Sequence, residues 1–260
     1  MTLSVDPIFS LLKSDFVCGY TDISNKKYAG ASGKHSPTEN AVHTTNGAGP
    51  HNIQIFVLAK DGTVLHCLPG YWKPKDLHGE LLFAKSVNEV WQNNNLTVPQ
   101  KRTMFSELNM AHIKEHEKGL SKRSKMQGFD LVHEAKHNPN SDFFYNPAKV
   151  DRQTGKTSKQ NVKTVDIVMH ERMAQRPFVQ FEHFDADTYS SYGKPMYDKH
   201  EQFRMANGQI APGSNLGAAP MIGNTPKAHP IKTGLKKAGS SIVQTTVNQA
   251  LRYGIRAILP

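Results

Sequence analysis

The chain has 260 residues, enough for one large domain or for a compact domain with a long appendage. Hydrophobic residues make up 37% of it, and no apolar run approaches the roughly 18 residues of a membrane-spanning helix, so we expect no transmembrane segment. Two cysteines cannot cross-link a chain of this length, which excludes a disulfide-built domain. The formal net charge is +10, and it is unevenly distributed.

The N-terminal region contains little regular pattern. Its first ten residues lack the basic start and apolar run of a signal peptide, so we expect the chain to stay where it is made, in the cytoplasm by default. Two short apolar stretches follow, at residues 8–12 and 16–20. A loop rich in Gly, Ser and Asn then runs to residue 50.

The segment 51–96 carries the clearest secondary-structure pattern. Residues 52–58 are apolar enough to predict a strand that is buried on both faces. The dipeptide Asp61-Gly62 predicts a two-residue hairpin turn, and residues 64–68 are the expected return strand. Residues 75–92 predict a helix. Its apolar face consists of Leu77, Leu81, Leu82, Ala84, Val87 and Trp91.

Residues 97–201 change in character. Pro99 suits the first turn of a helix, and apolar residues follow it at helical spacing. Residues 129–137 predict a short helix that Pro139 stops, and residues 162–174 are moderately periodic. Aromatic side chains are frequent after residue 177, and we expect them to pack onto the rest of the protein rather than to stack on nucleic-acid bases.

The C-terminal residues 202–260 contain no Asp or Glu and carry seven Lys and Arg. Their Gly, Pro and Ala content predicts an extended tail that is held by the body of the protein or by a partner. A basic tail of this kind can bind polyanions through counterion release. The alternative is a solvated extension, because no aromatic interleaving or nucleic-acid motif accompanies the charges.

The order of elements around residues 50–91 resembles the C-terminal half of the thioredoxin fold. Pro50, the strand, the Asp61-Gly62 turn, the antiparallel strand, Gly70 and the helix follow one another as in that family. The resemblance covers about residues 8–95 and implies an α/β domain with Pro50 as its cis-proline and Gly70 as a bend. It also implies that residues 16–20 form a central parallel strand.

The chain departs from thioredoxins because it has no Cys-x-x-Cys motif, whose thiolate carries their redox chemistry. In one alignment residues 16–20 follow a redox helix that is missing. In the other, Cys18 occupies the redox position with one cysteine left. We expect Cys67 to be a buried structural cysteine. A disulfide with Cys18 would need Cα atoms within about 7 Å, which the sequence does not decide.

Two histidine motifs have the spacing of zinc ligands. His133, Glu134 and His137 form a literal His-Glu-x-x-His, in which two histidines can share a zinc ion while the glutamate activates its water. Residues 112–116 contain the inverted motif His-x-x-Glu-His. A third ligand for the first motif is not identifiable, although His170 is a candidate. Because Pro139 truncates the helix, we expect no stoichiometric zinc at residues 133–137.

These patterns predict an α/β protein in three parts: a thioredoxin-like domain at 1–96, a mixed helical and aromatic extension at 97–201 and a basic tail at 202–260. The leading hypothesis is a non-catalytic binding or assembly module with no cofactor, whose partner is another protein or, through the tail, a polyanion. One alternative is a zinc-dependent hydrolase with His133 and His137 as ligands and Glu134 as base. Another is a thiol oxidoreductase that uses Cys18 beside Pro50.

Overall fold

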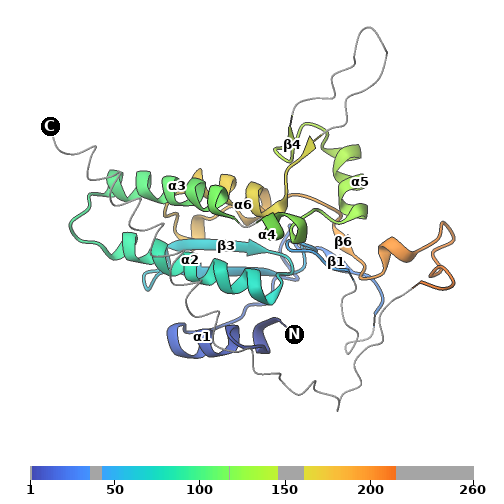
Figure 1. Cartoon of the computed structure of the whole chain (residues 1–260), viewed down its shortest axis with the longest axis horizontal. Helices are drawn as coiled ribbons and strands as arrows, with labels where there is room; N and C mark the ends of the chain where they lie inside the picture. Colours follow the sequence, from blue (N-terminus) through green and yellow to red (C-terminus); the bar gives the residue numbers. More distant parts are fainter. Residues whose placement is uncertain (1, 36–42, 117, 146–160, 215–260) are drawn as a thin grey trace, which may run out of the picture.

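The computed structural model describes residues 2–35, 43–116, 118–145 and 161–214. Within these ranges it is a mixed α/β structure with seven α-helices, three short 3₁₀ helices (η1–η3) and three two-stranded sheets (Figure 1). The elements are η1 Thr2–Ser4, α1 Ile8–Asp15, β1 Ala31–Ser32, β2 Gln54–Leu58, β3 Val64–Pro69, α2 Pro74–Gln92, α3 Val98–Glu115, α4 Lys118–Arg123, α5 Gly128–His137, β4 Phe144–Tyr145, β5 Asn161–Val162, α6 Val165–Ala174, η2 Phe181–His183, α7 Ala186–Tyr189, β6 Met196–Tyr197 and η3 Glu201–Phe203. Among the described helices, none combines the length and apolar character needed to cross a bilayer.

The antiparallel hairpin of β2 and β3 confirms the strand pair expected from the sequence, with Val57 opposite His66. The turn differs from the expected two-residue form. Gly62 N–H donates to the Ala59 carbonyl at 3.0 Å, and Gly62 has a φ of 82°. The loop therefore has three residues, and glycine takes the left-handed position that follows the turn in hairpins of this kind.

The two strands of the hairpin differ in burial. Every residue of β3 is buried, whereas Val57 is the only buried residue of β2, so the expectation of a β2 buried on both faces was wrong. The reason is the position of the neighbours. β3 contacts α2 and α6, and Tyr189 Oη donates to its Cys67 carbonyl at 2.9 Å. β2 lies farther out, where the Phe56 ring meets aromatic rings edge-on.

Helices α2, α3 and α6 pack together beside β3, and Figure 1 shows α3 and α6 lying side by side. α2 begins with a proline in its first turn, and α3 begins with a capping box between Thr97 and Gln100. The buried apolar residues form one cluster, whose members range in the sequence from Ile8 to Tyr192. The cluster therefore includes residues on both sides of the boundary expected at residue 96, among them Phe178, Phe184, Tyr189 and Tyr192.

Residues 16–20 do not form the central parallel strand that the thioredoxin resemblance implies. They follow α1 without regular secondary structure, and the side chains of Val17 and Tyr20 are 104% and 101% exposed. A central strand needs a neighbour on each side, and β2 and β3 pair only with each other among the described residues. The prediction of this strand was wrong.

Pro50 is not preceded by a cis peptide bond, which corrects the second expectation from the resemblance. The one cis bond among the described residues is Asp6–Pro7. Asn52 N–H donates to the Gly49 carbonyl at 3.0 Å, so Pro50 is the second residue of a β-turn. The second position of a β-turn suits a trans proline, whereas a cis proline is found at the third position.

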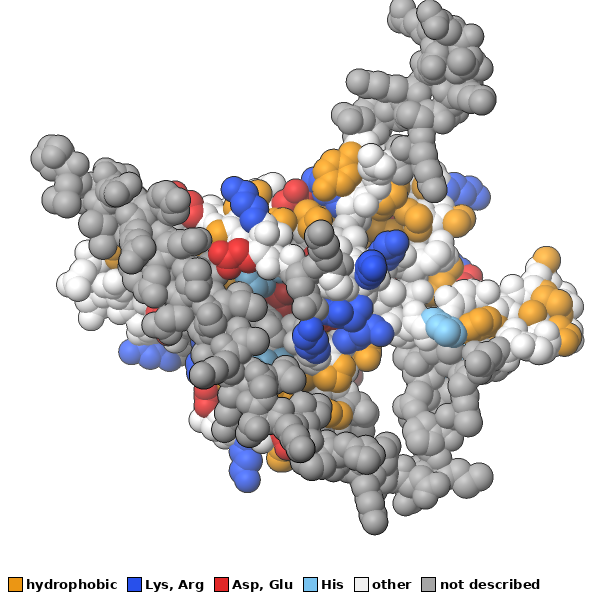
Figure 2. Space-filling view, viewed as in Figure 1, with side chains coloured by type: hydrophobic (Ala, Val, Ile, Leu, Met, Phe, Trp, Pro, Cys, Tyr) orange, Lys and Arg blue, Asp and Glu red, His pale blue; other side chains and the backbone are white. Residues whose placement is uncertain are grey.

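The predicted basic tail falls mostly outside the described residues, which end at 214. Its first part contains the end of η3 and an isolated bridge between Arg204 and Ile210. Figure 2 shows Lys and Arg side chains gathered near the middle of one face of the molecule. Part of the positive charge therefore lies on the described body as well as in the predicted tail.

Candidate metal centre

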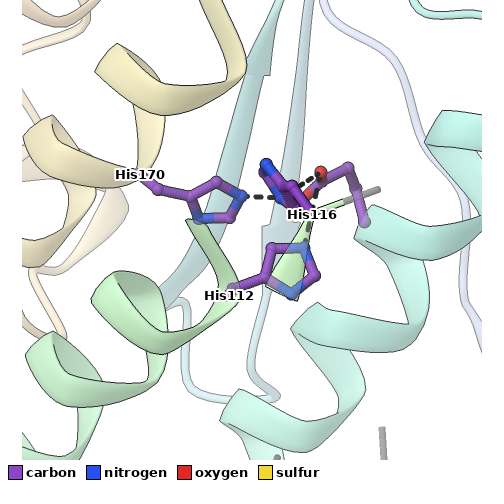
Figure 3. A group of neighbouring side chains, drawn as sticks. His112, His116 and His170 are labelled. Carbon is purple, nitrogen blue, oxygen red and sulfur yellow. Dashed lines mark hydrogen bonds and ion pairs between the residues drawn. The ribbon is translucent and has the colours of Figure 1, made fainter. Parts of the chain in front are cut away.

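Four metal-ligating side chains meet between α2, α3 and α6. They are Glu80, His112, His116 and His170, and one ligand atom from each lies within 4.8 Å of the other three. Figure 3 shows the three labelled histidines pointing toward one another, with His112 in α3, His116 directly after α3 and His170 in α6. This cluster could hold a metal ion.

Local sequence places each ligand on, or directly after, a helix that borders the cluster. His112 lies in the last turn of α3, and His116 caps the C-terminus of the same helix, so both are at one end of α3. Glu80 lies on the buried stripe of α2, between Leu77 and Ala84. α6 packs against both α3 and β3, and this contact brings His170 to the same point.

The distances from Glu80 to the three histidines are close to those between ligands that share one ion. Glu80 Oε1 lies 3.6 Å from His112 Nε2 and 3.9 Å from His116 Nε2, and Oε2 lies 3.1 Å from His170 Nε2. Four ligands at about 2.1 Å from a tetrahedral zinc ion lie about 3.4 Å from one another. The side chains therefore need little movement to bind a single ion.

Two polar neighbours fix the orientation of the histidine rings. His116 Nδ1 lies 2.8 Å from the Asp166 carboxylate, which can only accept, so Nδ1 carries the proton. The Asn109 amide nitrogen donates to the Phe105 carbonyl, which directs its oxygen to His170 Nδ1 at 2.9 Å. His170 Nδ1 is therefore also the donor. Such outer partners are the usual companions of metal-binding histidines.

The electrostatics of the cluster favour a cation. Burial lowers the pKa of His170 to about 3, more than Glu80 raises it, so this ring is neutral at pH 7. Burial raises the pKa of Glu80, but the surrounding histidines, His170 first and then His112, lower it by more, to well below its usual value. A buried carboxylate thus faces imidazole nitrogens from more than one element.

His116 also presents a nitrogen without a partner. Its Nε2 is buried and has no hydrogen-bond partner among the described residues. Burial lowers the pKa of His116, and the hydrogen bond to Asp166 and the charge of Glu80 raise it by more, so the pKa lies above its usual value. A metal ion at this nitrogen would therefore take the place of a proton.

Phe83 forms an apolar wall of the site, and one side of the site is open. The Phe83 ring lies 4.4 Å from the His112 ring and 5.0 Å from the His170 ring. The His112 side chain is 14% exposed, whereas the other three ligands are exposed by 6% or less. Solvent thus reaches the cluster from the His112 side.

The motif at residues 133–137 is not brought to this cluster. The rings of His133 and His137 stack on each other at 4.1 Å, and His137 is exposed. Glu134 is buried, and its Oε2 accepts from Gly193 N–H at 3.0 Å, which holds a loop in place. In the described ranges no further ligand atom completes a metal group with these histidines.

The two cysteines are free thiols in different surroundings. Cys18 is exposed in the irregular stretch after α1, and Cys67 is fully buried in β3. Burial raises the pKa of the Cys67 thiol well above its usual value, which makes it unreactive. This agrees with the structural role expected for Cys67.

Sequence reasoning found part of the cluster. The inverted motif contains His112 and His116, and His170 was considered as a third ligand, but for the other motif. Glu80 was missed, and Glu115 inside the motif does not take part. A signal for Glu80 was present, because a carboxylate on an otherwise apolar helix stripe needs a partner in the core.

Comparisons with known proteins do not identify the chain. No protein-family model, no curated protein and no solved structure matches it. The arrangement of the buried side chains is therefore the basis for a functional assignment.

Proposed function

We propose that the chain binds one divalent transition-metal ion, with zinc as the best fit, through Glu80, His112, His116 and His170. One observation carries the proposal. Glu80, His112, His116 and His170 meet in the interior with one ligand atom from each within 4.8 Å of the other three. No buried Lys or Arg of the described residues pairs with Glu80, so a cation bound by the cluster would balance its charge.

The chemistry of the donors supports zinc. Imidazole nitrogens suit zinc, copper, iron and nickel, whereas calcium and magnesium prefer sites made of oxygen. Three imidazoles and one carboxylate supply the four ligands of a tetrahedral zinc site. A site filled by four side chains is typical of structural zinc, so we expect the ion to tie α2, α3 and α6 together. This role fits the binding or assembly function expected from the sequence, which stays a prediction.

Metal analysis of the purified, untagged chain tests the proposal. We expect about one zinc ion per chain, and we expect His112→Ala and His170→Ala each to lose it. The double variant His133→Ala/His137→Ala is the matched control, because it removes two histidines at the same helical spacing from α5. A wild-type chain that binds no transition metal even after refolding with zinc would refute the proposal, as would loss of the ion in the control alone.

A further inference from the structure

A fourth histidine, His66, touches the cluster from the hairpin. It lies in the fully buried strand β3, and its Nε2 is 3.0 Å from Glu80 Oε2. Its Nδ1 is buried without a hydrogen-bond partner among the described residues. Because an ionised carboxylate can only accept, Nε2 carries the proton and donates it to Glu80. His66 thus differs from His116 and His170, whose protons are on Nδ1.

The position of His66 is that of an outer partner rather than a ligand. Its nitrogens do not belong to the group of ligand atoms that lie within 4.8 Å of one another. Its ring stacks on the His170 ring at 5.1 Å with an angle of 18°, and it meets the Phe83 ring edge-on at 5.4 Å. Neighbouring rings therefore hold the His66 ring in one orientation.

We infer that His66 is a positioning residue for the metal ion: its hydrogen bond to Oε2 holds the Glu80 carboxylate in the orientation in which it faces the three ligand histidines. The inference rests on the proposed metal site. Oε1 is the carboxylate oxygen that faces His112 and His116, at 3.6 and 3.9 Å. Without the His66 hydrogen bond, the carboxylate could rotate and present either oxygen. Outer partners of this kind typically change metal affinity by about 10- to 100-fold.

The test compares two substitutions of His66 in the full chain. His66→Leu fills the space but removes the donor, whereas the amide nitrogen of His66→Gln reaches as far as Nε2. Zinc affinity is measured by competition with a chelating dye, and the bound geometry by the visible spectrum of the cobalt-loaded protein. We expect His66→Leu to bind zinc about 10- to 100-fold more weakly with an altered cobalt spectrum, and His66→Gln to recover most of the affinity and the spectrum.

The control is Cys67→Ala, which removes a buried side chain from the opposite face of β3 and should leave both measurements unchanged. If His66→Leu does not fold, His66→Asn replaces it, because its shorter amide cannot reach Glu80. The inference would be overturned if His66→Leu and His66→Gln lost zinc affinity equally, or if both kept the wild-type affinity. A wild-type chain that binds no metal would instead overturn the proposed function.

Discussion

Glu80 and Asp130 are both buried carboxylates, but they have different partners. Glu80 is surrounded by histidines, which lower its pKa by more than burial raises it. Asp130 in α5 has no such neighbours, and its Oδ1 accepts from the backbone N–H of Lys194 at 2.8 Å. Burial above all raises the pKa of Asp130, to about 7. The nearby carboxylate of Glu134 raises it too, and the charge of Lys194 lowers it.

Asp130 should make stability depend on pH. Its pKa is higher in the folded state than in the unfolded chain, so the folded state binds more protons between about pH 4 and pH 7. Its contribution is therefore fully present below pH 4 and is lost as the pH rises to about 7, at up to about 1.4 kcal/mol per pH unit. Asp130→Asn keeps an acceptor for the Lys194 N–H and cannot titrate. Unfolding by urea at several pH values should show a weaker pH dependence in the variant, and identical profiles would contradict the assignment.

At the scale of elements, backbone geometry decides what each glycine does. Gly62 closes the hairpin at a φ of 82°, where a Cβ would meet only the Gln180 side chain at 3.5 Å. Gly79 lies inside α2 with open space around it. The two positions therefore differ in backbone conformation, whereas both have space for a Cβ atom.

The same substitution should have opposite effects at these two positions. Gly62→Ala forces a left-handed φ on alanine and should destabilise the protein by about 1–2 kcal/mol. Gly79→Ala should stabilise it by roughly 0.5–1 kcal/mol, because alanine suits the interior of a helix better. Thermal or urea unfolding measures both variants. A stabilising Gly62→Ala would show that the turn differs from the one described.

The proposed ion joins three helices, so its removal should loosen them together. Binding to the folded state alone stabilises by about 4 kcal/mol when free zinc is about 1,000 times its dissociation constant. We expect a chelator to lower the Tm and to speed amide exchange in α2, α3 and α6. Exchange in α5, which carries no ligand, should change less. A chelator that leaves the Tm of zinc-loaded protein unchanged would argue against a structural ion.

At the scale of the whole molecule, one core joins segments that the sequence suggested were separate. Phe105, Met169 and Tyr189 belong to the same buried cluster as Leu65 and Leu81. All of β3 is buried in this arrangement. The hairpin and α2 thus depend on residues that lie beyond position 96.

Truncation tests this dependence. A chain that ends at residue 96 should not fold, because β3 would lose the residues that cover it. A chain that ends at residue 214 keeps every described residue of the core and should unfold cooperatively and bind zinc. Circular dichroism during heating distinguishes the two. A stably folded 1–96 fragment would support the separate domain that the sequence pattern suggested.

The sequence by itself determined the local features of this protein. Two apolar runs and the Asp61-Gly62 dipeptide predicted the hairpin, and helical spacing predicted α2 and α5 close to their observed bounds. The inverted motif likewise brought together His112 and His116, which lie at the C-terminal end of α3. Each of these predictions depends on interactions between residues close in the chain, which short patterns encode.

Only the tertiary structure decided which of these features meet. Glu80 and His170 are 90 residues apart, and no local pattern links them. The same applies to residues 16–20, which the resemblance implied to be a central strand but which pair with no strand among the described residues. The resemblance to thioredoxin relied on the order of local elements, and the turn at Pro50 shows that the same order can have different geometry. Contacts between residues distant in the chain depend on the packing of the whole core. The folded state of lowest free energy is the one that buries the apolar faces and also pairs the buried charges.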